Sequence, residues 1–270
     1  MVNTPRAVMQ AVQQKLAEAG LDSVQFESRI LLETVLELPY GASLPQQPLT
    51  EAQQQRLAEL TARRCAHEPL QYLCGTWEFF GLEFQVGEGV LIPRQDTETL
   101  CEEAIALIKR RGYKTCLDLC AGSGCIGISI ANICGTEVTL ADISEAALSL
   151  CRENAEANGV SIRTIKTDMI DEITDKYDII VCNPPYLTAS DMASLQRELT
   201  FEPANALYGG VDGLDFYRRI ARDYAQRLND GGALALEVGI YQAEEVAKML
   251  GGARMVKDVC GIERAVIKEW

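Results

Sequence analysis

A tetrapeptide of unusual chemistry follows an apolar segment in the second half of the chain. Residues 177–186 are YDIIVCNPPY, so that Asn183, Pro184, Pro185 and Tyr186 begin where a buried strand would end. Each proline lacks a backbone N–H group and restricts the residue before it to extended conformations. The amide oxygen of Asn183 and the carbonyl oxygen of Pro184 can each accept one hydrogen from a planar –NH₂ group. The pattern therefore predicts a site that holds a planar amino or amide nitrogen, on which Tyr186 can pack.

A second candidate site is the segment LDLCAGSGCIG, which spans residues 117–127. Gly122 and Gly124 would let a ligand approach the backbone at the carboxyl end of a strand, where ligands of doubly wound sheets bind. Asp118 lies just before the loop. Asp142 ends the next predicted strand, where an acidic residue can accept hydrogen bonds from ribose hydroxyls. The segment is not a P-loop, because no Lys-Ser/Thr pair follows the glycines.

The glycine pattern leaves more than one ligand open. GSGCIG, residues 122–127, spells G-x-G-x-x-G, so a nicotinamide enzyme remains an alternative, as does a tight turn without a ligand. Carboxylates at this position suit both a ribose and a cation, and the sulfonium nucleoside S-adenosylmethionine offers both. A nitrogen held at residues 183–186 could then attack its methyl group in line with the sulfur. No base is needed first, since the nitrogen can lose its proton after it becomes cationic.

Strand-like and helix-like segments alternate from about residue 114 onward, and this arrangement should bring the two sites together. We predict strands over 114–119, 137–142, 161–168, 177–183 and 232–238, and helices over 125–134, 144–159, 214–228 and 241–250. The C-terminal segment 253–270 predicts two short strands around Gly261, which could form an antiparallel pair at a sheet edge. This alternation predicts an α/β fold with a mainly parallel sheet and helices on both faces. The glycine loop and residues 183–186 then face one crevice.

The N-terminal part of the chain has a different character. Residues 1–72 predict a small bundle of about three helices, with a proline-containing start at Thr4 and a capping-box pattern at Thr50. Residues 73–93 are rich in aromatic and β-branched residues and predict a β-hairpin linker. We therefore expect three parts, residues 1–72, 73–93 and 94–270.

Bulk composition narrows the classes of partner. The chain has 25 basic and 39 acidic residues, a net charge of −14, which argues against direct binding of nucleic acid. No apolar run is long enough for a membrane span, and the N-terminus lacks the apolar part of a signal peptide. The ten cysteines form no C-x-x-C pair and His67 is the one histidine, so zinc patterns are missing. We expect a cytoplasmic monomer without a metal.

Several segments together resemble the PrmC/HemK family of class I S-adenosylmethionine-dependent methyltransferases. The resemblance rests on LDLCAGSG and NPPY, and also on YLCGTWEFFGLEFQVGEGVLIPRQDTETL, FEPANALYGGVDGLDFYRRIA, LALEVGIYQ and DVCGIERAVI. It implies a Rossmann-like methyltransferase sheet with a C-terminal antiparallel hairpin, joined by a β-hairpin to a small N-terminal helical-bundle domain. It also implies transfer of a methyl group to N5 of the glutamine in the Gly-Gly-Gln loop of peptide chain release factors.

The resemblance also implies a role for individual positions. The cofactor-binding positions are Asp118, Cys120, Ala121, Gly122, Ser123, Gly124, Asp142, Asp168, Met169 and Asn183. The catalytic positions are Asn183, Pro184, Pro185 and Tyr186, and the positions near the substrate are Arg94 and Glu98. The loop departs from the family's usual Gly-Thr-Gly-Ser-Gly at Cys120 and Ala121, which puts cofactor affinity in doubt. Gln95 and Asp96 likewise depart from the family's PRPETE segment.

Three alternatives to this activity stay open from the residues alone. The same site could take the exocyclic amine of a nucleic-acid base, although the acidic net charge speaks against it. It could take a glutamine of a ribosomal protein. A cofactor-binding adaptor without catalysis is the third, and the intact residues 183–186 speak against it.

Overall fold

Residues 4–270 are described by the computed structural model. The chain divides into two compact units. The helical unit comprises Met1–Thr76 and Gln196–Phe201, and the larger unit comprises Trp77–Leu195 and Glu202–Trp270. The first three residues of the predicted helical domain lie outside the described part of the chain.

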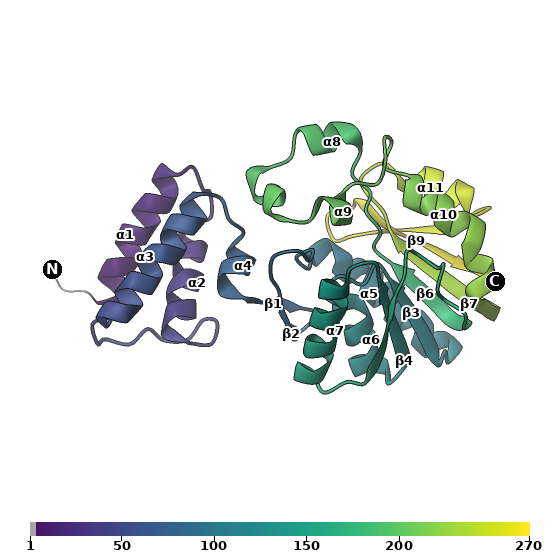
Figure 1. Cartoon of the computed structure of the whole chain (residues 1–270), viewed down its shortest axis with the longest axis horizontal. Coiled ribbons are helices and arrows are strands. Elements are labelled where there is room, and N and C mark those ends of the chain that lie inside the picture. Colours follow the sequence, from purple (N-terminus) through teal and green to yellow (C-terminus); the bar gives the residue numbers. More distant parts are fainter. Residues whose placement is uncertain (1–3) are drawn as a thin grey trace. The chain divides into compact units, whose positions relative to one another are not determined.

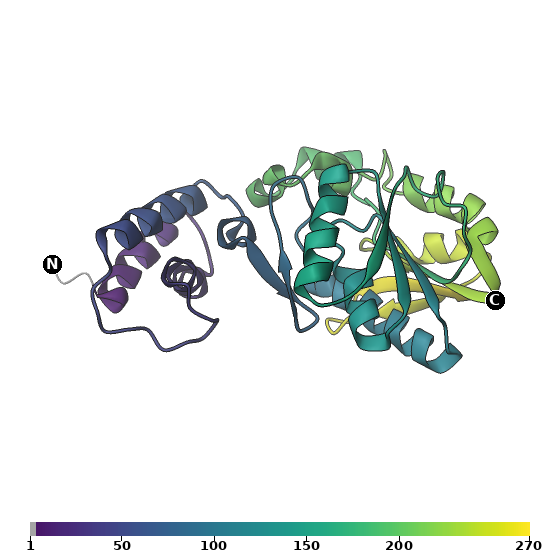
Figure 2. The ribbon, with the colours of Figure 1, turned by 60° about the horizontal axis from the view of Figure 1, so that its bottom comes forward.

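The helical unit is a small bundle, as predicted (Figures 1 and 2). Its elements are α1 (Pro5–Glu18), α2 (Val24–Leu36), α3 (Glu51–Cys65), α4 (Leu70–Cys74) and the 3₁₀ helix η2 (Arg197–Phe201). Leu16, Leu31 and Leu60 are fully buried between the helices. Thr50 begins α3 with the predicted capping box, because its hydroxyl accepts from the backbone N–H of Gln53.

A buried arginine joins the two chain segments of the helical unit. Arg64 on α3 is 2% exposed and makes two hydrogen bonds to the Glu27 carboxylate, at 2.7 and 2.9 Å. Its Nη2 atom also lies 2.5 Å from Glu198 in η2. A buried charge is tolerated only when it is paired in this way, so Arg64 fixes η2 to the bundle.

The larger unit is built on a seven-stranded sheet, in the order β5-β4-β3-β6-β7-β9-β8. The strands are β3 (Thr115–Leu119), β4 (Glu137–Asp142), β5 (Ile162–Lys166), β6 (Tyr177–Cys182), β7 (Leu228–Glu237), β8 (Arg254–Lys257) and β9 (Glu263–Glu269). The first five are parallel, whereas β9 is antiparallel to both β7 and β8. The mainly parallel sheet and the C-terminal antiparallel hairpin are therefore confirmed.

Helices cover both faces of this sheet (Figure 1). One face carries α5 (Glu98–Arg111), α6 (Cys125–Cys134) and α7 (Glu145–Ala157), and the other carries α10 (Asp215–Asp223) and α11 (Ala243–Met249). Successive residues of a strand point to opposite faces, so Ile179 and Val181 enter one core while Ile180 and Cys182 enter the other. This is why the strands at the centre of the sheet are apolar without alternation.

A two-stranded hairpin precedes the sheet, with β1 (Thr76–Phe79) and β2 (Leu82–Gln85). Phe79 and Phe84 are buried edge to face with ring centroids 6.2 Å apart. The remaining short elements are η1 (Gln95–Thr97), α8 (Ala189–Ala193), α9 (Ala204–Leu207) and η3 (Tyr224–Arg227). All ten cysteines are free thiols. Over residues 4–270, no helix has both the length and the apolar character that a membrane span requires.

Two neighbouring predicted boundaries were wrong. The helix predicted over 214–228 ends at Asp223, and β7 begins at Leu228 rather than at Gly232. The amide of Asn229 donates to Asp178 at the start of β6, at 2.8 Å, which extends β7 along its neighbour. A polar segment with two glycines gave no sign of this extension, because its strand character depends on that partner.

Candidate active site

A cavity of about 270 Å³ opens in the larger unit at the carboxyl ends of β3, β4 and β6. Ten of the predicted site residues line it: Arg94, Cys120, Ala121, Gly122, Ser123, Asp142, Asp168, Met169, Asn183 and Pro185. Five others do not: Glu98, Asp118, Gly124, Pro184 and Tyr186. The glycine loop and the tetrapeptide thus contribute to the same cavity wall, as the topology of a parallel sheet requires.

The glycine loop turns sharply after β3. Gly122 and Gly124 have φ values of +57° and +81°, and the N–H of Gly124 bonds the carbonyl of Ala121 at 2.8 Å. Cys120 also has a positive φ, +57°, although it carries a side chain. A non-glycine residue in this region costs about 1–2 kcal/mol, so the departure from glycine at Cys120 is a source of local strain. Its Sγ atom contacts Met169 Sδ at 3.7 Å.

Asp142 ties the loop to the end of β4. Its Oδ2 accepts from the N–H of Gly122 at 2.9 Å, and its Oδ1 accepts from the N–H of Ser144 at 2.8 Å. A carboxylate has about four acceptor positions, so each oxygen keeps one for a ligand. Asp142 is half-buried at the cavity wall and is placed to receive a pair of hydroxyl groups.

Asp118 lies one layer behind the cavity. It is fully buried, and its Oδ2 accepts from the N–H of Gly127 in the first turn of α6, at 2.9 Å. Burial raises the pKa of Asp118 to about 7. A Cβ atom at Gly127 would lie 2.3 Å from Leu140 Cδ2, so glycine permits close packing of α6 on β4. Asp118 therefore positions the helix that follows the loop.

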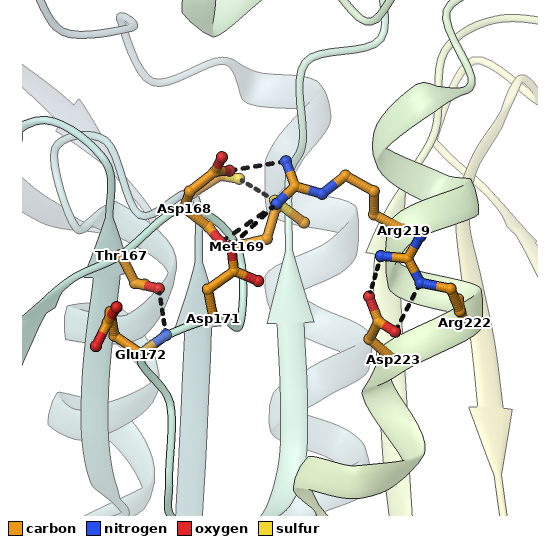
Figure 3. A network of polar contacts seen from close by, with 9 residues as sticks. Thr167, Asp168, Met169, Asp171, Glu172, Arg219, Arg222 and Asp223 are labelled. Carbon is orange, nitrogen blue, oxygen red and sulfur yellow. Dashed lines mark hydrogen bonds and ion pairs between the residues drawn. The ribbon is translucent and has the colours of Figure 1, made fainter.

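An arginine on the distant helix α10 holds the loop that follows β5 (Figure 3). Arg219 on α10 donates from Nη1 to the Asp168 carboxylate at 2.7 Å and from Nη2 to the Asp168 carbonyl at 3.3 Å. Met169 follows with φ of +56° and is buried. Arg219 also lies 3.7 Å from Asp171 and itself lines the cavity. These contacts fix the loop after β5.

Asn183 and Tyr186 lie at opposite ends of the tetrapeptide and contact different partners. Asn183 lines the cavity, and its Nδ2 atom donates to the Thr97 hydroxyl at 3.3 Å. The Tyr186 hydroxyl instead donates to Glu237 Oε1 at 3.4 Å. Thr97 lies in η1 and Glu237 ends β7; both are buried, with exposures of 2% and 1%.

Three glycines and a glutamine enclose the backbone around Tyr186. A Cβ atom at Gly209 would lie 2.6 Å from the Pro185 carbonyl oxygen, and one at Gly213 would lie 2.3 Å from the Tyr186 carbonyl oxygen. Gln242 donates from Nε2 to that same Tyr186 oxygen at 3.0 Å. Its Oε1 accepts from the N–H of Gly239 at 3.0 Å. The tetrapeptide is therefore held rigidly by segments far from it in sequence.

The arginine of the PRQDTE segment is fixed by a buried acid. Glu202 is 6% exposed; it pairs with Arg94 and also accepts from the N–H of Ile92 at 3.0 Å. Glu98 does not line the cavity but accepts from the N–H of Phe80 at 3.1 Å, which secures the hairpin turn. Thr97, Glu202, Arg219 and Glu237 were not predicted as site residues. All four lie within the segments that carry the family resemblance, and this position was the one signal that could have found them.

Comparisons with known proteins agree with this arrangement. A methyltransferase small domain model matches residues 104–211, and a PrmC N-terminal domain model matches residues 7–75. A release factor glutamine methyltransferase of Geobacter sulfurreducens is 38% identical over 97% of this chain and 95% of its own. The chain belongs to the release factor glutamine methyltransferase family. Another member, from Bordetella pertussis, is 40% identical over 92% of this chain and 95% of its own.

The structural likeness extends beyond this family. A 16S rRNA methyltransferase of T. thermophilus, solved with AdoMet and guanosine, superposes with a TM-score of 0.52 at 20% identity. The match covers 72% of this chain and 49% of the other. At that identity the likeness concerns the fold alone, and it confirms a class I methyltransferase sheet for this family member.

Proposed function

We propose that this family member transfers a methyl group from S-adenosylmethionine to N5 of the glutamine in the Gly-Gly-Gln loop of peptide chain release factors. One observation carries the proposal. The acidic residue that can bind a ribose, Asp142, and the amide that can hold a planar nitrogen, Asn183, line the same cavity. Membership of the family supports the choice of substrate.

The cavity residues fit the cofactor. Asp142 keeps free acceptor positions for ribose hydroxyls, and Asp168 with Met169 would border the adenine. The backbone of residues 120–124 would follow the remaining part of the molecule. S-adenosylmethionine supplies a methyl group on a positively charged sulfur, and the carboxylates along this wall favour that charge.

The substrate nitrogen would be held where Asn183 lines the cavity. The Asn183 amide oxygen would accept one hydrogen of the glutamine –NH₂ group, and the carbonyl oxygen of Pro184, which lies between two lining residues rather than in the lining itself, would accept the other. Two acceptors fix the nitrogen and favour tetrahedral character, which frees its lone pair for attack. Because the Tyr186 hydroxyl is bonded to Glu237, its ring is held in place to border the substrate amide.

Mass spectrometry of a bacterial release factor tests the proposal. We expect a gain of one methyl group on the Gly-Gly-Gln peptide after incubation with the protein and S-adenosylmethionine. A release factor with glutamate in place of that glutamine is the control and should gain none. Transfer to a ribosomal protein or to nucleic acid, with none to the release factor, would contradict the proposed substrate.

A further inference from the structure

The Asn183 side chain can be useful in only one of its two amide orientations. Its oxygen must face the cavity to accept a hydrogen, so its –NH₂ group must face elsewhere. In the structure Nδ2 points to the Thr97 hydroxyl, at 3.3 Å. The orientation of a side-chain amide follows from its hydrogen-bond network, so the partner of Nδ2 determines whether the Asn183 oxygen faces the cavity.

Thr97 can accept from Asn183 because its own proton has another partner. A hydroxyl has one proton to donate and can accept as well. The Thr97 hydroxyl faces the buried Glu237 carboxyl group closely enough to lower the pKa of Glu237, and Glu237 Oε2 has no other hydrogen-bond partner of standard geometry within residues 4–270. With the proton directed to Glu237, the lone pairs of the Thr97 oxygen remain for Nδ2 of Asn183.

Glu237 also accepts a hydrogen bond from Tyr186, the last residue of the tetrapeptide. The Tyr186 hydroxyl donates to Glu237 Oε1 at 3.4 Å, and burial raises the pKa of Tyr186, which keeps that proton on the phenol. Glu237 Oε2 makes no hydrogen bond of standard geometry within residues 4–270. The Glu237 main chain is fixed too, because the Tyr217 hydroxyl donates to its carbonyl at 2.9 Å. The same buried carboxyl group thus accepts from Tyr186 and faces Thr97.

The charge on Glu237 decides the direction of these hydrogen bonds. Burial raises the pKa of Glu237 to about 7, and Arg264 on β9 opposes this effect. The other titratable groups that face it are Asp96, Cys125, Tyr186 and Tyr217. Above this pH the carboxylate accepts only, and the Thr97 proton must point to it. Below it a protonated Glu237 can donate to Thr97 and reverse the arrangement.

We propose that Thr97 and Glu237 are positioning residues that hold the Asn183 amide with its oxygen toward the substrate nitrogen. The inference rests on the role proposed above for Asn183. Under this inference the buried Thr97 and Glu237 orient the Asn183 amide, in addition to stabilising the fold. Neither residue touches the reacting atoms, and both act through Asn183.

Three variants of the full chain test the inference. Thr97→Val removes the hydroxyl, Thr97→Ser keeps it, and Glu237→Gln places an –NH₂ donor where an acceptor stood. We expect Thr97→Val and Glu237→Gln to lower kcat about 10- to 100-fold, with KM for the release factor and cofactor affinity changed less than about twofold. Thr97→Ser should keep most of the wild-type kcat. The wild-type kcat should rise through about pH 7, and Glu237→Gln should lack that rise.

A second measurement separates this inference from the proposed function. The side-chain –NH₂ resonances of Asn183, assigned by their loss in Asn183→Ala, should shift in Thr97→Val and Glu237→Gln and stay in place in Thr97→Ser. This test needs no substrate, so a wild-type protein that failed to methylate the release factor would overturn only the proposed function. Unshifted resonances in both variants would overturn the inference. An equal loss of kcat in Thr97→Val and Thr97→Ser would also overturn the inference. If Thr97→Val does not fold, Glu237→Gln provides the same test.

Discussion

Arg219 Nη1 lies 2.7 Å from the carboxylate of Asp168, 51 residues away in sequence, and this pair fixes the loop that borders the proposed adenine position. Arg219→Ala should release this loop. The pair is partly exposed, so its effect is modest, and we expect the dissociation constant for S-adenosylmethionine to rise about three- to tenfold. Isothermal titration calorimetry measures this directly.

A neighbouring arginine provides the matched control. Arg222, about one turn further along α10, pairs with Asp223 (Figure 3), and neither residue lines the cavity. Arg222→Ala should leave cofactor affinity unchanged. Equal affinities for Arg219→Ala and the wild type would mean that the loop is held without the arginine.

Removal of the Asn183 side chain should abolish transfer while cofactor binding persists. Asn183 contributes one of two acceptors for the substrate nitrogen, and loss of one such group costs about 10²- to 10³-fold in kcat. We expect Asn183→Ala to fall by at least that factor in a methyl-transfer assay, with cofactor affinity within about threefold of wild type. Full activity of Asn183→Ala would show that the amide does not hold the substrate.

Gly127 marks the closest approach of α6 to the sheet. A Cβ atom there would lie 2.3 Å from Leu140 and 3.0 Å from an Asp118 oxygen. We expect Gly127→Ala to lower the free energy of unfolding by about 1–3 kcal/mol, as overpacking does. Denaturant unfolding measures the change. Gly87→Ala is the control, because a Cβ atom at Gly87 meets nothing within 4 Å; a Gly127→Ala variant as stable as this control would contradict the prediction.

Two buried carboxyl groups should make stability fall as pH rises. Burial raises the pKa of Asp118 and of Glu237 to about 7, well above their ordinary values. Their contribution is therefore complete below about pH 4 and is lost as pH rises toward 7. Each group should change the free energy of unfolding by on the order of 3 kcal/mol over this range. Denaturant unfolding at a series of pH values should show the decline.

Asp118→Asn isolates one of the two contributions. It should make the decline between about pH 4 and 7 roughly half as steep, since Glu237 still titrates. Asp178→Asn is the control, because hydrogen bonds lower the pKa of Asp178 and its titration lies below this range. An unchanged slope in Asp118→Asn would mean that Asp118 does not titrate in this range in the folded protein.

The fold followed from local patterns. The central strands β3, β4 and β6 were predictable because each is a mostly apolar segment with glycine, asparagine or aspartate nearby, and the βαβ alternation leaves few topologies open. The capping box at Thr50 depends on residues three apart and was equally visible. The length of β7 was not, because residues 228–231 become strand only beside Asp178.

The site residues also fall into those that were predictable from local sequence and those that were not. Asn183, Gly122 and Asp142 were identifiable because each combines a suitable residue type with a position at the end of a predicted strand. Glu237 and Arg219 act through contacts with residues 51 positions away, and no local pattern reports such a distance. Buried polar residues like these look in a sequence like any other polar residue beside an apolar segment.

The two-segment make-up of the helical unit has a consequence for its synthesis. Arg64 can meet Glu27 as soon as α3 has formed, but Glu198 is 134 residues further along the chain. During translation the buried Arg64 guanidinium is therefore paired with Glu27 but lacks its Glu198 partner until most of the larger unit has left the ribosome. Residues 1–76 expressed as a fragment would remain in that unfinished state. The helical unit is completed late in the synthesis of the chain, although α1 to α4 precede the larger unit in sequence.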